Sequence, residues 1–214
     1  MKIAQISDTH IRSLSRHDEC RLVFRAMNKK LRIQNPDHIV HTGDIFHTKT
    51  QGISPEYINL LSEWLTSLAL IAPLHIVLGN HDGNLVNLSR DDAVSPIVRA
   101  LGNPRIFLYK DSGVYQFAEG YNWCVYSIFD VDGWSKVQPI SGDVNIAIYH
   151  GSVLGAITEA DYELEGDMKV EFFENYHACM LGDIHKTQFL GYREYEFEID
   201  EEDIKKYPGA VVIS

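Results

Sequence analysis

Short apolar runs alternate with amphipathic stretches in the first hundred residues. The runs 2–7, 38–41 and 74–78 have the length of strands, and polar residues follow each of them. Between them, residues 15–32 and the stretch from 54 onward repeat apolar side chains at helical spacing. This alternation of strand and helix predicts a parallel sheet covered by helices.

The two predicted helices each have an apolar face. The first begins near Ser15, ends before the helix-stopping segment 35–37, and is predicted to bury one set of side chains: Leu22, Val23, Ala26, Met27 and Leu31. The second opens with a proline suited to the first helical position. It is predicted to bury a leucine and tryptophan stripe: Leu60, Leu61, Trp64, Leu65 and Leu68.

The second half of the chain is richer in strands. Strand-like runs are predicted at 105–109, 113–117, 123–128, 144–149 and 178–181, followed by a long alternating strand or hairpin at 188–199. These runs predict a second, mixed sheet packed on the first. With neither a repeat nor a linker, residues 1–214 form one α/β domain, with two packed mixed β-sheets flanked by helices.

Composition narrows the class of protein. The 214 residues are 45% hydrophobic, which is typical of a globular domain, and the three cysteines are far apart, which excludes a disulfide scaffold. No apolar run approaches the roughly 20 residues of a membrane span. The first ten residues do not resemble a signal peptide. A cytoplasmic protein is expected.

The net charge of −11 argues at first against nucleic acid as a partner. Its distribution changes that conclusion. Residues 159–206 hold 15 acids and 5 bases, a balance of −10, whereas residues 1–32 have a balance of +5. We therefore expect a basic N-terminal region and an acidic C-terminal segment.

Metal-compatible residue types follow five of the strand-like runs. They form one ordered set: Asp8 and His10, Asp44 and His47, Asn80 with His81 and Asp82, His150, and Asp183 with His185. Because ligands bind at the carboxyl ends of strands in open α/β sheets, these clusters should converge. Their oxygen and imidazole donors suit Mn²⁺, Fe²⁺ or Zn²⁺ better than a dedicated Ca²⁺ or Mg²⁺ cage.

Alternatives exist for the individual residues. A single Asp-x-His or Gly-Asp after a strand is more typical of turn chemistry than of a metal site. For Asp82 we favour a carboxylate that caps a loop. Arg12 and Arg16 follow the first cluster, and both phosphate contact and simple solvent exposure are open for them.

The motifs DTH at 8–10, GDIFH at 43–47, GNHD at 79–82, HG at 150–151 and GDIH at 182–185 resemble those of the calcineurin-like metallophosphoesterases. GDIFH with GNHD is similar to the nuclease branch, the SbcD-type subunits of bacteria and their phage counterparts. The resemblance covers residues 2 to about 209 and implies a four-layer sandwich. It also implies that a capping domain and an ATPase-binding tail follow in longer relatives, so that this domain is C-terminally truncated.

The resemblance further implies two divalent metal ions, Mn²⁺ first and Mg²⁺ as the alternative. Asp8, His10, Asp44 and His185 would hold one ion, and Asp44, Asn80, His150 and Asp183 the second. His81 would be the acid or transition-state donor, oriented by His47. The family usually has histidine where this chain has Asp183, which favours harder metals.

The implied function is DNA cleavage. Nuclease-branch proteins act as exonucleases and endonucleases in DNA recombination and repair, together with an SMC-like coiled-coil ATPase, and commonly dimerise. For a phage protein the location would be the host cytoplasm. Two alternatives stay open: a phosphatase or cyclic-nucleotide phosphodiesterase of the same superfamily, and a weakly catalytic scaffold that binds DNA ends.

Overall fold

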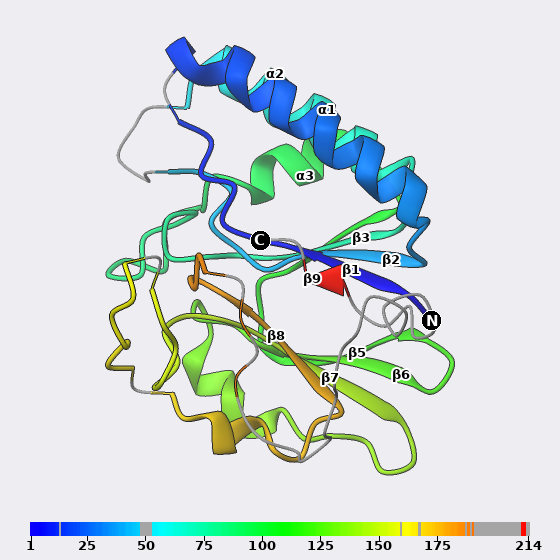
Figure 1. Cartoon of the computed structure of the whole chain (residues 1–214), viewed down its shortest axis with the longest axis vertical. Coiled ribbons are helices and arrows are strands. Elements are labelled where there is room, and N and C mark those ends of the chain that lie inside the picture. The colour runs from blue at the N-terminus through cyan, green and yellow to red at the C-terminus, as the bar shows by residue number, and fades with distance from the viewer. Residues whose placement is uncertain are drawn as a thin grey trace.

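Two β-sheets lie face to face in this protein, with α-helices over the outer face of the first (Figure 1). The computed structural model describes residues 1–12, 14–47, 53–158, 160–166, 168–186, 188, 190 and 211–212. The predicted α/β architecture with two packed sheets is confirmed.

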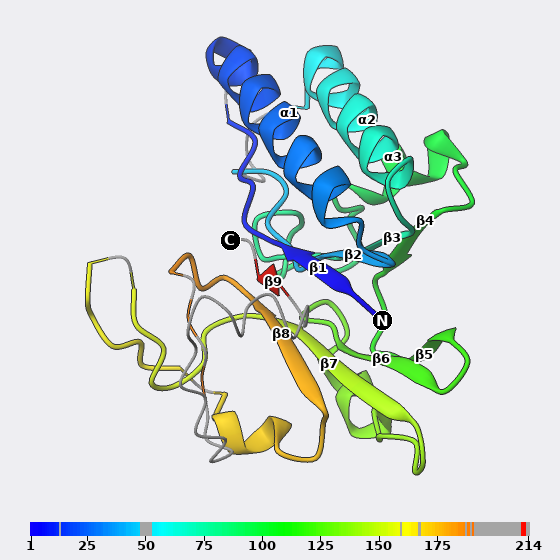
Figure 2. The same cartoon turned by 45° about the vertical axis from the view of Figure 1, so that its right-hand side comes forward.

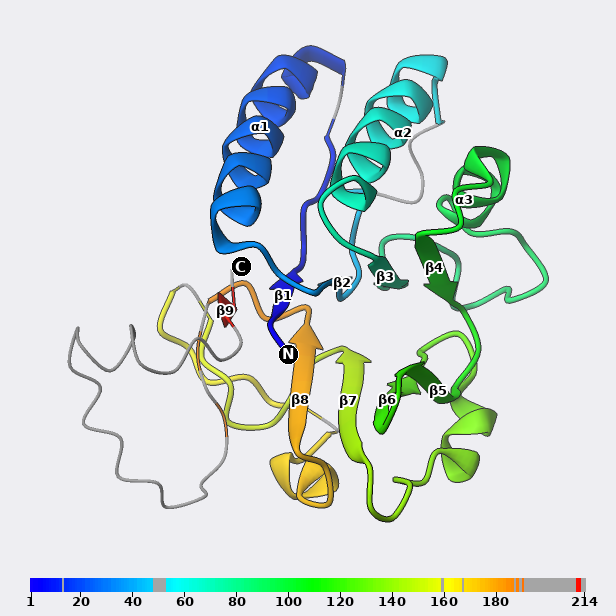
Figure 3. The ribbon, with the colours of Figure 1, turned by 90° about the vertical axis from the view of Figure 1, so that its right-hand side faces the viewer.

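The first sheet has the strand order β4-β3-β2-β1-β9. Its strands are β1 (Ile3–Ile6), β2 (His38–His41), β3 (Leu74–Val77), β4 (Ile106–Tyr109) and β9 (Val211–Val212). Every pairing among these strands is parallel, as the alternation of strand and helix predicts. Figure 3 shows the strands side by side, with β9 beside β1 at the edge.

The second sheet has the order β5-β6-β7-β8. Its strands are β5 (Gly113–Ala118), β6 (Tyr121–Tyr126), β7 (Val144–His150) and β8 (Ala178–Gly182). The pair β5 and β6 is antiparallel, and β6, β7 and β8 run parallel, so this sheet is mixed. The strand or hairpin predicted at 188–199 lies almost entirely outside the described residues.

Three α-helices cover the first sheet: α1 (His17–Gln34), α2 (Pro55–Ala69) and α3 (Ser95–Leu101). Figure 2 shows α1 and α2 side by side. A 3₁₀ turn, η1 (Leu14–Arg16), precedes α1, and Asn35 ends α1 in the left-handed conformation at φ 47°. Asparagine is among the few residues that tolerate this conformation, so the predicted stop is confirmed.

The predicted inner face of α1 is wrong in part. Leu22 and Val23 are 64% and 58% exposed, and Ala26 is also exposed. The helix instead buries Phe24, which stacks on Trp64 of α2 with ring centroids 4.0 Å apart. This aromatic contact sets the rotation of the helix about its axis. Consequently Leu31 and, in part, Met27 face inward, while Leu22 and Val23 face solvent.

Apolar side chains fill three layers. One lies between the helices and the first sheet and includes Ile6, Ile39 and Leu65. Alternation along β6 defines the other two, since Trp123 and Val125 pack between the sheets, whereas Cys124 and Tyr126 face outward. The outer layer is covered by two 3₁₀ turns, η2 (Val131–Lys136) and η3 (Val170–Phe173).

Cys20, Cys124 and Cys179 are all free; Cys124 is buried and the other two are partly buried. Among the residues that the structure describes, no helix combines the length and the apolarity that crossing a membrane requires.

Candidate metal centre

The five polar clusters meet at one edge of the molecule. The loops after β1, β2, β3, β7 and β8 leave the two sheets on the same side (Figure 1). Because these strands point the same way, their carboxyl ends bring together residues that are far apart in the chain. Three donor groups of suitable spacing result: Asp8, His10 and His185; His10, Asp44 and His81; and Asp8, Asp44 and His150.

One set of donor atoms surrounds His10. Its Nε2 lies 3.2 Å from Nε2 of His185, 3.9 Å from Oδ1 of Asp8 and 3.7 Å from Oδ2 of Asp44. Asp8 Oδ1 is also 3.8 Å from Nε2 of His185. Two imidazoles and two carboxylates therefore face one point, which we call the first position.

A second set surrounds Nε2 of His150. That atom lies 3.3 Å from Oδ1 of Asn80, 3.4 Å from Oδ1 of Asp44 and 3.9 Å from Oδ1 of Asp183. Three oxygen donors therefore lie around one imidazole nitrogen, and we call this group the second position.

Asp44 belongs to both sets. Its Oδ2 faces His10 and its Oδ1 faces His150, and its side chain is only 1% exposed. A buried carboxylate with one oxygen toward each set is what a pair of adjacent cations requires of a bridging ligand. The donor types also suit transition-metal dications. The residues present therefore fit two divalent ions.

The backbone at this edge is strained. Asp8, His10, Asp44 and Asp183 have φ values of 52°, 42°, 57° and 73°, in the left-handed region that few residues other than glycine adopt. Such conformations cost on the order of 1–3 kcal/mol each and persist where the surroundings enforce them. Their concentration here supports a functional role for these residues.

Two glycines allow the loops to approach each other. A Cβ added to Gly79 would lie 2.1 Å from Oδ1 of Asp44 and 2.7 Å from Cε1 of His150. A Cβ on Gly43, whose φ is 104°, would lie 2.4 Å from Nδ1 of His150. Both positions must lack a side chain for Asp44 and His150 to come together.

His150 is fixed in orientation by the main chain. Its Nδ1 donates to the carbonyl oxygen of Thr42 at 2.7 Å, which leaves Nε2 free to face the second position. Burial alone would lower the pKa of His150, but the hydrogen bond and charge of Asp44 raise it to about 9. Burial would raise the pKa of Asp44, yet His150 holds it below its ordinary value. The two side chains thus form a buried ion pair.

The structure orients His81 through the main chain of His47. Nδ1 of His81 contacts the carbonyl oxygen of His47, so Nδ1 is the donor of that hydrogen bond. The rings of His47 and His81 stack with centroids 6.1 Å apart. Nε2 of His81 lies 3.9 Å from Oδ2 of Asp44, and the ring is 39% exposed. His81 therefore presents Nε2 between the cluster and solvent.

Asp82 caps two loops that carry candidate ligands. Its Oδ2 accepts hydrogen bonds from the backbone N–H groups of Asp44 and Gly79, both at 2.9 Å, and its Oδ1 accepts one from Phe46 at 3.1 Å. Burial raises the pKa of Asp82 to about 7, against the effect of these hydrogen bonds. The carboxylate caps a loop, as expected, and the loops it joins are those that position Asp44 and Asn80.

The two arginines differ. Arg12 is exposed. The pKa of His47 is lowered first by the burial of its own ring and second by the charge of Arg12, so Arg12 lies near the cluster. Arg16 bonds Glu19 through Nε at 2.7 Å and Nη2 at 2.5 Å. Its guanidinium is thus engaged on the surface of α1, so Arg12 is the better placed of the two to meet a phosphate.

Ser152 is a site residue that the sequence did not reveal. Its Oγ donates to Oδ2 of Asp183 at 3.1 Å. Ser152 follows the His150-Gly151 pair, but a serine two residues after a histidine carries no specific signal. The contact depends on β7 and β8 lying side by side.

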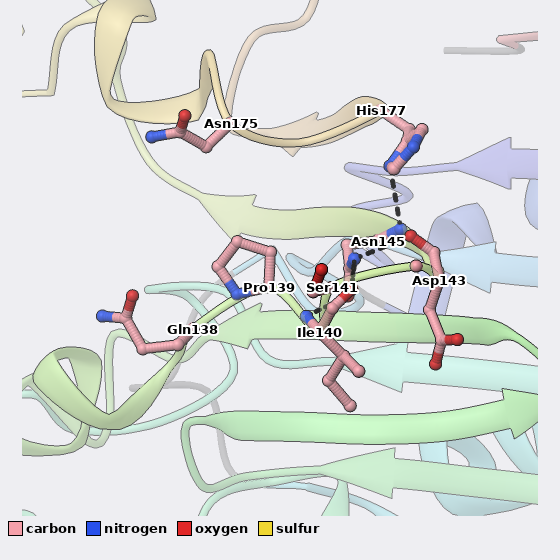
Figure 4. Close-up of a pocket in the computed structure, with 9 residues that line it drawn as sticks. Gln138, Pro139, Ile140, Ser141, Asp143, Asn145, Asn175 and His177 are labelled. Carbon is pink, nitrogen blue, oxygen red and sulfur yellow. Dashed lines mark hydrogen bonds between the residues drawn. The ribbon is translucent and has the colours of Figure 1, made fainter.

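A second hollow lies at the opposite end of β7 and β8, with a volume of about 430 Å³ (Figure 4). It is bordered by residues 138–143, Asn145, Asn175 and His177. Asn145 in its wall is buried, and its amide bonds the backbone of Ile140 and Asp143. This hollow is separate from the donor sets described above.

A protein-family model and individual known proteins match this chain. A family model described as calcineurin-like phosphoesterase matches residues 1–207. The chain is 41% identical over 206 residues to the uncharacterized protein R555 of Acanthamoeba polyphaga mimivirus; the match covers 88% of this chain and 15% of that protein. The crystal structure of Pseudomonas putida nuclease MPE matches with a TM-score of 0.38 and 16% identity, covering 75% of this chain and 66% of that one. The chain belongs to the calcineurin-like phosphoesterase family of metal-dependent hydrolases.

Proposed function

We propose that this chain is a two-metal DNA phosphodiesterase that works in DNA recombination and double-strand-break repair. The observation that carries the proposal is the position of Asp44 between the two donor sets. Asp8, His10, Asp44 and His185 would hold the first ion, and Asp44, Asn80, His150 and Asp183 the second. When bound, such a pair neutralises phosphate oxygens and lowers the pKa of a water that attacks phosphorus.

Exposure at the edge of the cluster favours a polymeric substrate. The side chains of His81 and His185 are 39% and 48% exposed, whereas Asp44 and His150 beneath them are buried. A phosphodiester within a long strand can reach such an edge, while a small ester would be better held in a closed pocket. The similarity of GDIFH and GNHD to the nuclease branch supports the same substrate.

His81 would supply the proton that the leaving sugar oxygen needs. Its Nδ1 is engaged with the main chain of His47, so the free Nε2 is the atom that faces the reacting phosphate. Arg12 would contact a neighbouring phosphate of the strand, and Arg16, once released from Glu19, could do the same.

The test is hydrolysis by the purified chain with Mn²⁺ or Mg²⁺. Labelled duplex and single-stranded DNA, a chromogenic phosphodiester and a chromogenic phosphomonoester are compared. We expect DNA and the diester to be cleaved, and Asp8→Ala to abolish cleavage while far-ultraviolet circular dichroism stays unchanged. His177→Ala, which alters a histidine at the opposite end of the sheet, is the matched control.

Other outcomes would select the alternatives. Preference for the monoester, or for a cyclic nucleotide, would indicate a phosphatase or phosphodiesterase of the same superfamily. Tight binding of DNA ends without any cleavage would indicate a scaffold. Either result would overturn the nuclease proposal.

We also propose that the chain acts with an SMC-like coiled-coil ATPase and pairs with a second copy of itself. Both proposals rest on the nuclease-branch motifs. Because that branch includes phage proteins, we also propose a phage origin. Light scattering of the purified chain tests the dimer. Co-expression with an SMC-like coiled-coil ATPase tests the partner; failure to co-purify would count against it.

A further inference from the structure

The two positions offer different chemistry to a metal ion. The first has two imidazoles, from His10 and His185, and two carboxylates. The second has a single imidazole, from His150, and three oxygens. Imidazole nitrogen suits Zn²⁺ and Fe²⁺, whereas carboxylate and carbonyl oxygens suit Mn²⁺ and Mg²⁺.

Asp183 is responsible for this difference. Its φ of 73° and the donation of its backbone N–H to both carboxylate oxygens of Asp8, each at 3.2 Å, anchor its main chain at the cluster. Ser152 donates to Oδ2 at 3.1 Å, and this leaves Oδ1 on the side of His150. Asp183 is therefore fixed at two points, its main chain by Asp8 and its carboxylate by Ser152.

The rest of the second set is oxygen-rich and buried. Asn80 and Asp44 each present Oδ1 to His150 within 3.4 Å, and Asp44 is 1% exposed. A histidine in place of Asp183 would give the two positions the same balance of nitrogen and oxygen. The aspartate makes them unequal and adds a negative charge to the second.

We propose that the two positions select different ions, and that Asp183 is the residue that makes the second position prefer a hard ion, Mn²⁺ or Mg²⁺, over Zn²⁺. The inference rests on the proposed two-metal function and specifies its metals. The first position, with its two imidazoles, accepts Zn²⁺ more readily.

Crystals of metal-stripped protein, soaked with excess Mn²⁺ and limiting Zn²⁺, test this directly. Anomalous data collected on both sides of the zinc absorption edge give the occupancy of each ion at each position. Because Zn²⁺ binds more tightly than Mn²⁺ to most sites, the ratio of the two ions is the informative quantity. We expect the Zn²⁺ to Mn²⁺ ratio to be about tenfold or more higher at the first position.

Two variants separate the role of Asp183 from general damage. Histidine and asparagine both tolerate a left-handed backbone, so Asp183→His and Asp183→Asn should fold. Asp183→His is expected to bring Zn²⁺ into the second position. Asp183→Asn keeps an oxygen donor, so its second position is still expected to exclude Zn²⁺. The total occupancy of metal at that position should fall, because the negative charge is lost.

The outcomes are distinguishable from failure of the proposed function. Equal ratios at both positions in the unaltered protein would overturn the inference and leave a two-metal enzyme. An unchanged second position in Asp183→His would overturn the role of Asp183. If neither Zn²⁺ nor Mn²⁺ binds at either position, the two-metal function itself is overturned.

Discussion

At the scale of single residues, His81, the proposed acid, is oriented by the backbone of His47. The contact of His81 with His47 uses the backbone carbonyl oxygen of residue 47. Any residue at position 47 would supply that oxygen, provided that the backbone keeps its place. The motif GDIFH suggests a histidine side chain as the orienting group. The structure instead assigns that contact to the main chain.

We expect His81→Ala to lower kcat with DNA by about 10²- to 10⁴-fold, the usual contribution of a positioned acid. His47→Ala should keep kcat within about tenfold, because the carbonyl remains. Single-turnover cleavage with Mn²⁺ measures both, and titration calorimetry verifies that each variant still binds metal. A His47→Ala defect as large as that of His81→Ala would refute the main-chain account.

Asp82 holds two ligand loops with three backbone hydrogen bonds. In Asp82→Asn one oxygen becomes an NH₂ group that faces backbone N–H groups, so we expect a loss of about 1–3 kcal/mol in the free energy of unfolding. Weaker Mn²⁺ binding should accompany it, because Asp44 and Gly79 lose a shared acceptor.

Asp92 provides the matched control for this variant. It is also buried and accepts backbone N–H groups, from Val94 and Ser95, neither of which is a candidate ligand, and it forms an ion pair with Lys110 at 3.0 Å. Urea denaturation and calorimetry should show a comparable loss of stability in Asp92→Asn with unchanged Mn²⁺ affinity. Equal loss of Mn²⁺ affinity in both variants would mean that Asp82 acts only through stability.

At the scale of elements, the rotation of α1 gives a direct test. Phe24 is 6% exposed and stacks on Trp64, so Phe24→Ala should cost about 3–5 kcal/mol of unfolding free energy. Leu22, at 64% exposure, should tolerate alanine within about 0.5 kcal/mol. Thermal or urea unfolding measures the loss of unfolding free energy in both variants. A large loss in Leu22→Ala would mean that Leu22 is buried, as the sequence pattern predicts.

His75 on β3 is a neutral histidine within the interface of the two sheets. Trp123 donates from Nε1 to Nδ1 of His75 at 3.1 Å, so that nitrogen is an acceptor and Nε2 faces His38 at 3.0 Å. Burial, then the charge of His38, lowers the pKa of His75 from 6.5 to about 3. Protonation of Nδ1 would break the contact with Trp123.

Acid should therefore destabilise the protein through His75. Between pH 6.5 and about 3 the unfolded chain takes up a proton that the folded chain does not, so stability falls as pH falls through this window. The effect reaches about 2 kcal/mol at pH 5. Urea unfolding of metal-free His75→Gln across this range should show a flatter pH dependence; an unchanged slope would contradict the assignment.

Much of the fold and site could be predicted from sequence because strand ends are marked locally. Apolar runs that stop at Asp, Asn and His fix both the strands and the clusters behind them, and parallel strands bring those clusters together. The inner face of α1 could not be predicted, because Phe24 and Leu22 belong to two overlapping helical stripes. Contacts across elements, such as Ser152 with Asp183, have no local signature at all.

At the scale of the whole molecule, the candidate metal centre is a concentration of carboxylates. Asp8, Asp44 and Asp183 converge there with histidines as their partners. Divalent ions that bind only the folded chain stabilise it by mass action, by about 2.7 kcal/mol at a hundredfold excess over Kd. For a chain of this size that corresponds to a rise of about 5–10 °C in Tm.

We expect Mn²⁺ to produce this rise in differential scanning fluorimetry. Asp44→Asn should abolish most of it, because one substitution weakens both positions. Without metal the variant should be less stable than the original, because it breaks the buried ion pair with His150, so the rise in Tm is measured for each protein against its own metal-free sample. A full Mn²⁺ response in Asp44→Asn would exclude Asp44 as a shared ligand.

The left-handed backbone at residues 8, 10, 44 and 183 also limits what can replace these residues. Aspartate, asparagine and histidine are the non-glycine types that tolerate this conformation best, and they are also oxygen and nitrogen donors. Glycine would adopt the same backbone at lower cost, so folding alone gives no reason for side chains at these four positions. The energy stored in the loops is therefore the cost of bringing the donor atoms of these side chains together.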